Sequence, residues 1–190
     1  QRAAEGQALA VSQNELAGVF QHLNPENRKS LAAVLDGARE ATPDELPVVD
    51  AVRKWLDTKF DLVQEAMQQA DPSGGFGKIE DRYLPWMMSR EARDYMSSPT
   101  SPYLGDLKKG FDDGDPVGVF QHRQIAQKVK AGEKVKWFGT TLTADDLHLE
   151  RLNELARKGG FAGDFFETDV AAILERYAAQ HAKQMGIAAR

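Results

Sequence analysis

The sequence contains no cysteine. This absence excludes disulfides, thiolate zinc sites, iron–sulfur clusters and cysteine nucleophiles, and it fits a reducing compartment. No window approaches 18 consecutive apolar residues, and the first residues lack a charged region followed by an apolar stretch. We therefore expect neither a membrane span nor a secretion signal, and a cytoplasmic chain whose fold depends on packing.

Recognisable catalytic motifs are also missing. The histidines do not occur at the His-x-x-x-His or His-Glu-x-x-His spacing that would put two metal ligands on one helical face. The run Asp112, Asp113, Asp115 lacks the residue order of a calcium loop, and Gly74–Gly77 lacks the ending of a phosphate-binding loop. We expect no catalytic residue, no metal and no cofactor, with His181 as a hydrogen-bonded core histidine on an apolar helical stripe.

The composition is that of a folded protein, because 42% of the 190 residues are hydrophobic and 28% are charged. The net charge of −5 is unevenly distributed. Residues 1–120 carry 13 basic and 20 acidic side chains, whereas residues 121–190 carry 11 basic and 9 acidic ones, so only the second part suits a polyanion. The chain begins without Met, and its first residues resemble the interior of a helix. This start predicts a segment of a longer protein.

Apolar residues in the first part recur at helical spacing and predict three helices. Ser12 is expected to cap the first, which ends near Leu23, and Asn24-Pro25 to start a second that runs to about Arg39. The longest is expected from Thr42 to about Gln69, because its apolar residues form one stripe.

Periodicity is poor from residue 74 to 118, where Ser89 is expected to cap one short helix ending at Met96. A helix over 122–130, a short strand over 134–138 and two final helices follow. The final helices are expected to start at Thr143 and at Thr168-Asp169, and the first of them to end at Gly159-Gly160. The predicted fold is mainly α: an irregular helical bundle with a loop-rich middle and at most one short strand or hairpin. The expected regions are 1–73, 74–118 and 119–190, with the last either separate or packed on the first.

Two segments are candidates for binding. The densest apolar stretch either covers the core or anchors a partner chain, since aromatic residues and Met are enriched at interface centres. A second, basic segment has the lysines and aromatic residues of nonspecific nucleic-acid binding, although Glu133 interrupts it and Trp137 has a buried position as its alternative. The apolar candidates are Tyr83, Leu84, Pro85, Trp86, Met87 and Met88, and the basic candidates are Lys128, Lys130, Lys134, Lys136 and Trp137.

Several short motifs follow one another between residues 24 and 180. They are Asn24-Pro25-Glu26-Asn27-Arg28, Val52-Arg53-Lys54-Trp55-Leu56, a glycine-rich linker, Asp81-Arg82-Tyr83-Leu84-Pro85-Trp86-Met87, Ser89-Arg90-Glu91-Ala92 and Phe166-Glu167-Thr168-Asp169-Val170-Ala171-Ala172-Ile173-Leu174. Their order resembles segments of large tailed-bacteriophage virion proteins associated with the head, the portal or the ejected internal proteins. The resemblance implies a structural or assembly role in a virion assembled in the host cytoplasm, and it supplies no catalytic residues.

The leading functional expectation is thus a virion structural or assembly protein, or a helical domain of one. It would act by packing against copies of itself or other virion proteins. A noncatalytic nucleic-acid-binding module that makes weak DNA contacts through the basic segment is the alternative. A fragment of a larger enzyme, with active residues supplied by flanking sequence, is the second alternative.

Overall fold

A computed structural model describes residues 1–70, 84–99 and 125–189. These residues are mainly helical, with one small two-stranded sheet, which confirms the predicted fold class. The chain forms two compact units. Unit 1 comprises Gln1–Tyr83 together with Asp169–Arg190, and unit 2 comprises Leu84–Thr168.

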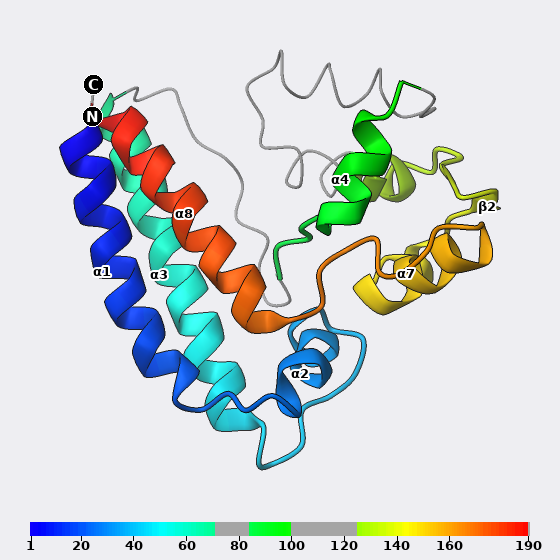
Figure 1. Cartoon of the computed structure of the whole chain (residues 1–190), viewed down its shortest axis with the longest axis horizontal. Helices are drawn as coiled ribbons and strands as arrows, with labels where there is room; N and C mark the ends of the chain where they lie inside the picture. The colour runs from blue at the N-terminus through cyan, green and yellow to red at the C-terminus, as the bar shows by residue number, and fades with distance from the viewer. Residues whose placement is uncertain (71–83, 100–124, 190) are drawn as a thin grey trace. The chain divides into compact units, whose positions relative to one another are not determined.

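Unit 1 is a helical bundle. It contains α1 (Arg2–Phe20), α2 (Asn27–Leu35), α3 (Leu46–Ala70) and α8 (Val170–Ala188). The long helices α1, α3 and α8 run side by side, and the shorter α2 lies at one end of them (Figure 1). The core consists of apolar stripes from all four helices, so the final helix of the chain packs with the first.

The longest helix follows its predicted stripe. Val49, Val52 and Leu56 are buried, as helical spacing on one face requires. The segment before α3 is fixed by Glu45, whose carboxylate accepts hydrogen bonds from the Thr42 backbone N–H and from Arg39. The bonds from Arg39 lower the pKa of Glu45 to about 2. This arrangement places the helix start at Leu46, a few residues after the predicted one.

The first two helices differ from the prediction at their ends. Ser12 is not a cap, because it lies in the middle of α1 and is fully buried. The helix extends back to Arg2 because the residues before Ser12 are rich in alanine, a strong helix former. The second helix begins at Asn27 because the Asn24 side chain accepts the backbone N–H groups of Glu26 and Asn27 in a turn. It ends at Leu35, before Gly37, whose φ of 77° leaves the helical region.

α1 and α8 pack closely because α8 presents small residues to α1. Ala178, Ala182 and Gly186 recur every fourth position and are buried. A methyl group placed on Gly186 would lie 3.0 Å from the Cβ atom of Glu5. Small side chains thus allow the backbones of the first and last helices to approach each other.

Unit 2 combines short helices with the sheet. It contains α4 (Arg90–Ser97), a helical segment at 125–130, β1 (Lys136–Trp137), β2 (Thr140–Thr141), the 3-10 helix η1 (Ala144–Asp146) and α7 (Leu149–Lys158). The strands are antiparallel, with Lys136 opposite Thr141 and Trp137 opposite Thr140. Phe138 and Gly139 both have positive φ, as a tight hairpin turn requires. The predicted strand is therefore one arm of a hairpin.

The helix start predicted at Thr168-Asp169 is confirmed, whereas Thr143 starts a 3-10 turn instead of the α-helix predicted there. Thr143 and Asp146 form a capping box, although it opens η1 and α7 begins only at Leu149. Gly159 ends α7, and the Asp169 side chain accepts the backbone N–H groups of Ala171 and Ala172 at the start of α8. These bonds satisfy N–H groups that the first turn of a helix leaves unpaired.

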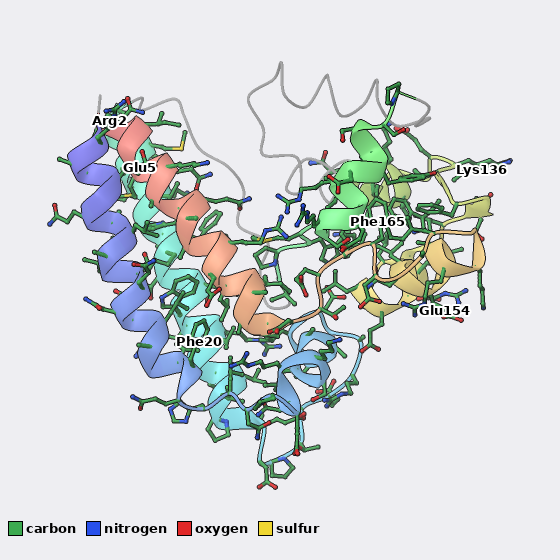
Figure 2. The ribbon with its side chains drawn as sticks, in the orientation of Figure 1. Arg2, Glu5, Phe20, Lys136, Glu154 and Phe165 are labelled. Atoms are coloured by element: carbon green, nitrogen blue, oxygen red, sulfur yellow. The ribbon has the colours of Figure 1, made fainter. Side chains whose placement is uncertain are left out.

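Aromatic side chains fill the core of unit 2. The ring centroid of Trp137 lies 4.7 Å from that of Phe165 and 5.7 Å from that of Phe166. Trp137 Nε1 donates a 2.9 Å hydrogen bond to the backbone oxygen of Leu152 in α7. The Asn153 side chain accepts from the Phe166 backbone N–H and donates to its carbonyl. Figure 2 shows Phe165 among these side chains.

The cap of α4 gives a first prediction. Ser89 Oγ accepts the backbone N–H of Ala92, so the change Ser89→Ala is expected to lower the free energy of unfolding by about 1 kcal/mol. Chemical denaturation followed by circular dichroism measures this change. Ser97→Ala in the last turn of the same helix is the matched control, and an equal effect of both changes would refute the capping role.

The unit boundaries differ from the regions expected from the sequence. Residues 125–168 pack with 84–99 in unit 2, whereas α8 belongs with α1 and α3 in unit 1. The expected region 119–190 is therefore divided at Asp169. The division falls there because the chain turns at Thr168-Asp169 and starts α8. The small and apolar residues of α8 then pack on α1 and α3.

Candidate binding groove on unit 1

Residues of the three long helices of unit 1 line an open groove. α1 and α3 each pack on α8, and the space between them has a volume of about 540 Å³. That volume lies in the range of ligand-binding pockets. The groove is lined by Ala4, Gln7, Ala8, Val11, Lys59, Leu62, Ala66, Gln69, Ala70, His181, Met185, Ala188 and Ala189.

The rim of the groove is apolar and open to solvent. Val11 on α1 is 47% exposed and Leu62 on α3 is 40% exposed, which makes them two of the exposed large hydrophobic residues in the described part of the chain. Six of the other residues that line the groove are alanines. The groove therefore presents an apolar surface that no described residue covers.

The buried Lys59 at the inner wall of the groove forms an ion pair with a partly exposed carboxylate. Lys59 is only 1% exposed, and its ammonium group pairs with the Glu15 carboxylate, whose side chain is 41% exposed. Trp55 Nε1 donates a 3.1 Å hydrogen bond to the same carboxylate oxygen. The lysine ammonium also lies 5.9 Å from the centroid of the Trp55 ring. The positive charge of Lys59 is thus neutralised inside the bundle.

His181 completes the polar part of the groove. Its ring is 3% exposed, and its Nδ1 atom has no hydrogen-bond partner among the described residues. Burial, with a smaller effect of the nearby Lys59 charge, lowers the pKa of His181 to about 4. Because the ring also hydrogen-bonds to the backbone of Lys59, the neutral imidazole uses its N–H there and leaves Nδ1 as a buried acceptor. The prediction of a core histidine is confirmed.

The lowered pKa of His181 predicts an acid-sensitive fold. The unfolded chain binds a proton near the ordinary value of 6.5, whereas the folded ring does so only at about 4. Falling pH therefore favours the unfolded state, and stability present above 6.5 is lost progressively towards pH 4. Between pH 7 and pH 5 we expect His181 to account for a loss of about 2 kcal/mol.

Denaturation of the wild type and of the variant His181→Gln at both pH values measures this loss. The variant is expected to lose that part of the pH dependence, and His22→Gln, at an exposed position, is expected to keep it. Parallel pH profiles for wild type and His181→Gln would contradict the assignment.

The predicted apolar segment lies inside unit 2. Leu84, Trp86, Met87 and Met88 are each at most 3% exposed. The Met87 carbonyl accepts the backbone N–H of Glu167, and Met88 forms a β-bridge with Phe166. Pro85 is also buried, and Tyr83 lies outside the described residues. The arrangement of residues 84–88 matches the alternative in which this stretch covers the core, and the side chains of these five residues are buried.

The basic segment is divided by burial. Lys128, Lys130, Lys134 and Lys136 are all exposed, as is Glu133, and Lys136 extends away from the hairpin (Figure 2). Trp137 is 2% exposed and lies in the aromatic core. The lysines remain available to phosphates, but Trp137 is not available to stack on a base.

No metal-binding cluster occurs within the described residues, since no group of three His, Asp or Glu side chains could hold an ion there. The acidic run at 112–115, the glycine-rich run at 74–77 and His122 lie outside these residues. No helix in the described ranges has the length and hydropathy needed to cross a membrane.

Sequence reasoning missed the groove, although one signal for it was present. Lys59 lies four residues after Trp55 and four before Val63, so it falls on the apolar stripe of α3. A charged residue on such a stripe requires a buried partner. The identity of that partner, Glu15, depends on the packing of α1, which the sequence pattern does not contain.

Comparison with known proteins gave no match. No family model, no curated protein and no solved structure is similar to this chain at a significant level.

Proposed function

We propose that this chain is a noncatalytic helical association module of a tailed-bacteriophage virion, which packs against neighbouring head or portal proteins or copies of itself. One observation supports association: the groove of unit 1 has an apolar rim that no described residue covers. The virion assignment is supported by the resemblance of the motifs between residues 24 and 180.

The energetics of the rim favour a protein partner. Val11 and Leu62 are exposed on two helices that line one groove, so a partner in the groove could bury both side chains. Burying a side chain such as Val11 or Leu62 stabilises a complex by about 1.5–3 kcal/mol relative to leaving it fully exposed, and roughly half of that is available here because both are part-exposed. Two such residues on facing helices give an anchor of a few kcal/mol.

Size-exclusion chromatography with light scattering, and capture by purified head and portal proteins of the parent phage, test this function. The wild type is expected to self-associate or to bind one of these proteins, and the double change Val11→Asp, Leu62→Asp to abolish that binding. Ile187→Asp is the matched control, because Ile187 is 54% exposed on unit 1 but does not line the groove. A strictly monomeric chain that binds no virion protein would refute the function.

A further inference from the structure

A partly exposed aromatic pair lies on unit 2. Tyr95 on α4 stacks on Phe138 in the hairpin turn, with ring centroids 5.9 Å apart and an interplanar angle of 30°. Phe161 lies edge-on to Tyr95, with ring centroids 5.5 Å apart. Despite these two contacts Tyr95 is 36% exposed, which makes it one of the exposed large hydrophobic residues in the described part of the chain. Part of the tyrosine is therefore open to solvent beside a second ring.

The position of Phe138 in this pair depends on a strained backbone. Its φ is 47°, and the next residue, Gly139, has a φ of 85°. A two-residue hairpin turn needs such values, but Asn, Asp or Gly normally takes the first place because a bulky side chain is unfavourable there. The Phe138 ring contacts Phe161 and Phe165, with centroids 6.0 Å and 5.6 Å away. The turn thus holds Phe138 between the aromatic core and Tyr95.

Lysines without acidic partners precede the turn. The segment 128–136 contains four lysines and one acidic residue, Glu133, which gives it a net charge of +3. All four lysines are exposed, and none forms an ion pair within the part of the chain that the structure describes. They are Lys128, Lys130, Lys134 and Lys136.

The backbone joins these lysines to the aromatic pair. Lys134 and Lys136 are two residues apart in extended chain, so they lie on one side, opposite to the side on which Trp137 is buried. Lys136 comes two residues before Phe138. At the other end, the backbone N–H of Glu133 donates a 2.9 Å hydrogen bond to the Lys128 carbonyl and folds the preceding helical segment back beside the strand. The rings of Tyr95 and Phe138 and the four lysines are together called the aromatic–lysine surface.

Other charged residues near the rings add no net charge. Gly159 packs against Phe138, but Lys158 beside it is already paired with Glu154 at 2.7 Å. α4 exposes two basic and two acidic side chains, which are Arg90, Glu91, Arg93 and Asp94. The positive charge of the aromatic–lysine surface therefore comes from the segment 128–136.

We propose that unit 2 binds single-stranded nucleic acid, with a base stacked on the Tyr95–Phe138 pair and the adjacent phosphates held by Lys134 and Lys136. Lysines neutralise phosphates, and aromatic rings stack on unpaired bases of any sequence. The stacking role expected for Trp137 falls to the aromatic pair, because Trp137 is buried. A duplex is disfavoured, since its bases are already stacked and paired. This binding activity goes beyond the association proposed for unit 1 and does not depend on it.

Fluorescence anisotropy on the full chain tests the proposal. The probes are labelled oligothymidylate of about 12 nucleotides, oligouridylate of the same length, and an abasic strand that keeps the phosphates and lacks the bases. At least one of the first two is expected to bind about tenfold more tightly than the abasic strand, a difference of about 1.4 kcal/mol from base stacking. The tighter of the two identifies the preferred sugar. Equal affinity for all three probes would overturn the proposal.

Variants of Tyr95 test the stacking contact. Tyr95→Leu keeps an apolar side chain but removes the ring, so it is expected to lower the affinity for the preferred strand about tenfold and to leave the affinity for the abasic strand unchanged. Tyr95→Phe keeps the ring and is expected to bind both as the wild type does. A preference for bases that persists in Tyr95→Leu would contradict the stacking role.

The salt dependence of binding tests the phosphate contacts. The double change Lys134→Gln, Lys136→Gln is expected to weaken the binding of every probe and to reduce the slope of log affinity against log salt concentration by about 1.4, or about 0.7 for each lost phosphate contact. Lys29→Gln with Lys54→Gln removes the same charge from exposed positions of unit 1 and is expected to leave the slope unchanged. Equal slopes for the two double variants would refute the lysine contacts.

Two further probes separate this proposal from other ligands. Tighter binding of a DNA duplex of the same length than of either single strand would overturn it, and so would equally tight binding of polyglutamate, which would identify an acidic protein as the ligand. The double change Val11→Asp, Leu62→Asp in unit 1 is expected to leave nucleic-acid binding intact, because these residues lie outside the aromatic–lysine surface. Loss of association with virion proteins and loss of nucleic-acid binding are thus measured by different variants.

Discussion

Replacing Glu15 with glutamine is expected to lower the free energy of unfolding by about 3 kcal/mol, because it leaves the Lys59 ammonium buried without a counter-charge. The value lies at the low end for breaking a buried ion pair, since Glu15 itself is 41% exposed and water screens its charge. Trp55 keeps an acceptor, as the glutamine oxygen takes the place of the carboxylate oxygen. The loss is therefore specific to the charge. Urea denaturation at neutral pH measures it.

A double-mutant cycle separates this loss from general disruption of packing. Lys59→Met replaces the buried cation with an apolar chain of similar length and leaves Glu15 partly in water, so we expect a change of less than about 1.5 kcal/mol. In the Lys59→Met background, Glu15→Gln is expected to cost little, which gives a coupling energy of roughly 2 kcal/mol or more. Additive effects of the two changes would refute the ion pair as the source of the loss.

The change Trp137→Ala in unit 2 is expected to lower the free energy of unfolding by about 3–5 kcal/mol, more than the change Ser89→Ala in the same unit. It removes the ring that packs on Phe165 and Phe166 and leaves the backbone carbonyl of Leu152 without its donor. Near-ultraviolet circular dichroism and denaturation of the full chain would report the loss of aromatic packing.

The neighbouring residue is the control for this prediction. Lys136→Gln changes an exposed side chain on the same strand, so its effect on stability is expected to stay within about 0.5 kcal/mol. If Trp137→Ala were as mild as Lys136→Gln, the indole would not be a core residue. Its assignment to nucleic-acid stacking would then regain support.

Much of the fold is predictable because its helix boundaries are local. Ser89, Thr143 and Asp169 each have a side chain that bonds to backbone N–H groups within three residues, so their spacing alone indicates a helix start. The stripe of α3 is also local, since it depends only on a 3.6-residue period. These features require no knowledge of the rest of the chain.

The errors lie where local signals are weak or conflict. The first half of α1 is rich in alanine, which favours a helix but gives little contrast between its faces, so the sequence pattern places the helix start wrongly at Ser12. The turn at Asn24 and the positive φ of Gly37 shorten α2 at both ends. Helix propensity and capping compete at such positions, and the tertiary packing decides between them.

The candidate groove was less predictable than the fold because it is a product of long-range packing. Glu15 and Lys59 come from different helices, and His181 comes from the other end of the chain. The sequence indicates that Lys59 and His181 occupy apolar stripes. It does not indicate that they line the same space. The segment from Leu84 to Met88 has the composition of a protein interface, but its side chains are buried in unit 2. There its backbone forms a hydrogen bond between Met87 and Glu167, which the sequence does not indicate.

The order of the elements has a consequence for biosynthesis. α1 and α3 emerge from the ribosome first, but the helix that covers their shared apolar side is made only after the whole of unit 2. At about 5–20 residues per second, this delay is on the order of ten seconds. During that time the apolar faces of α1 and α3 are exposed on the nascent chain. We therefore expect a chaperone or an assembly partner to bind these faces most readily before translation ends.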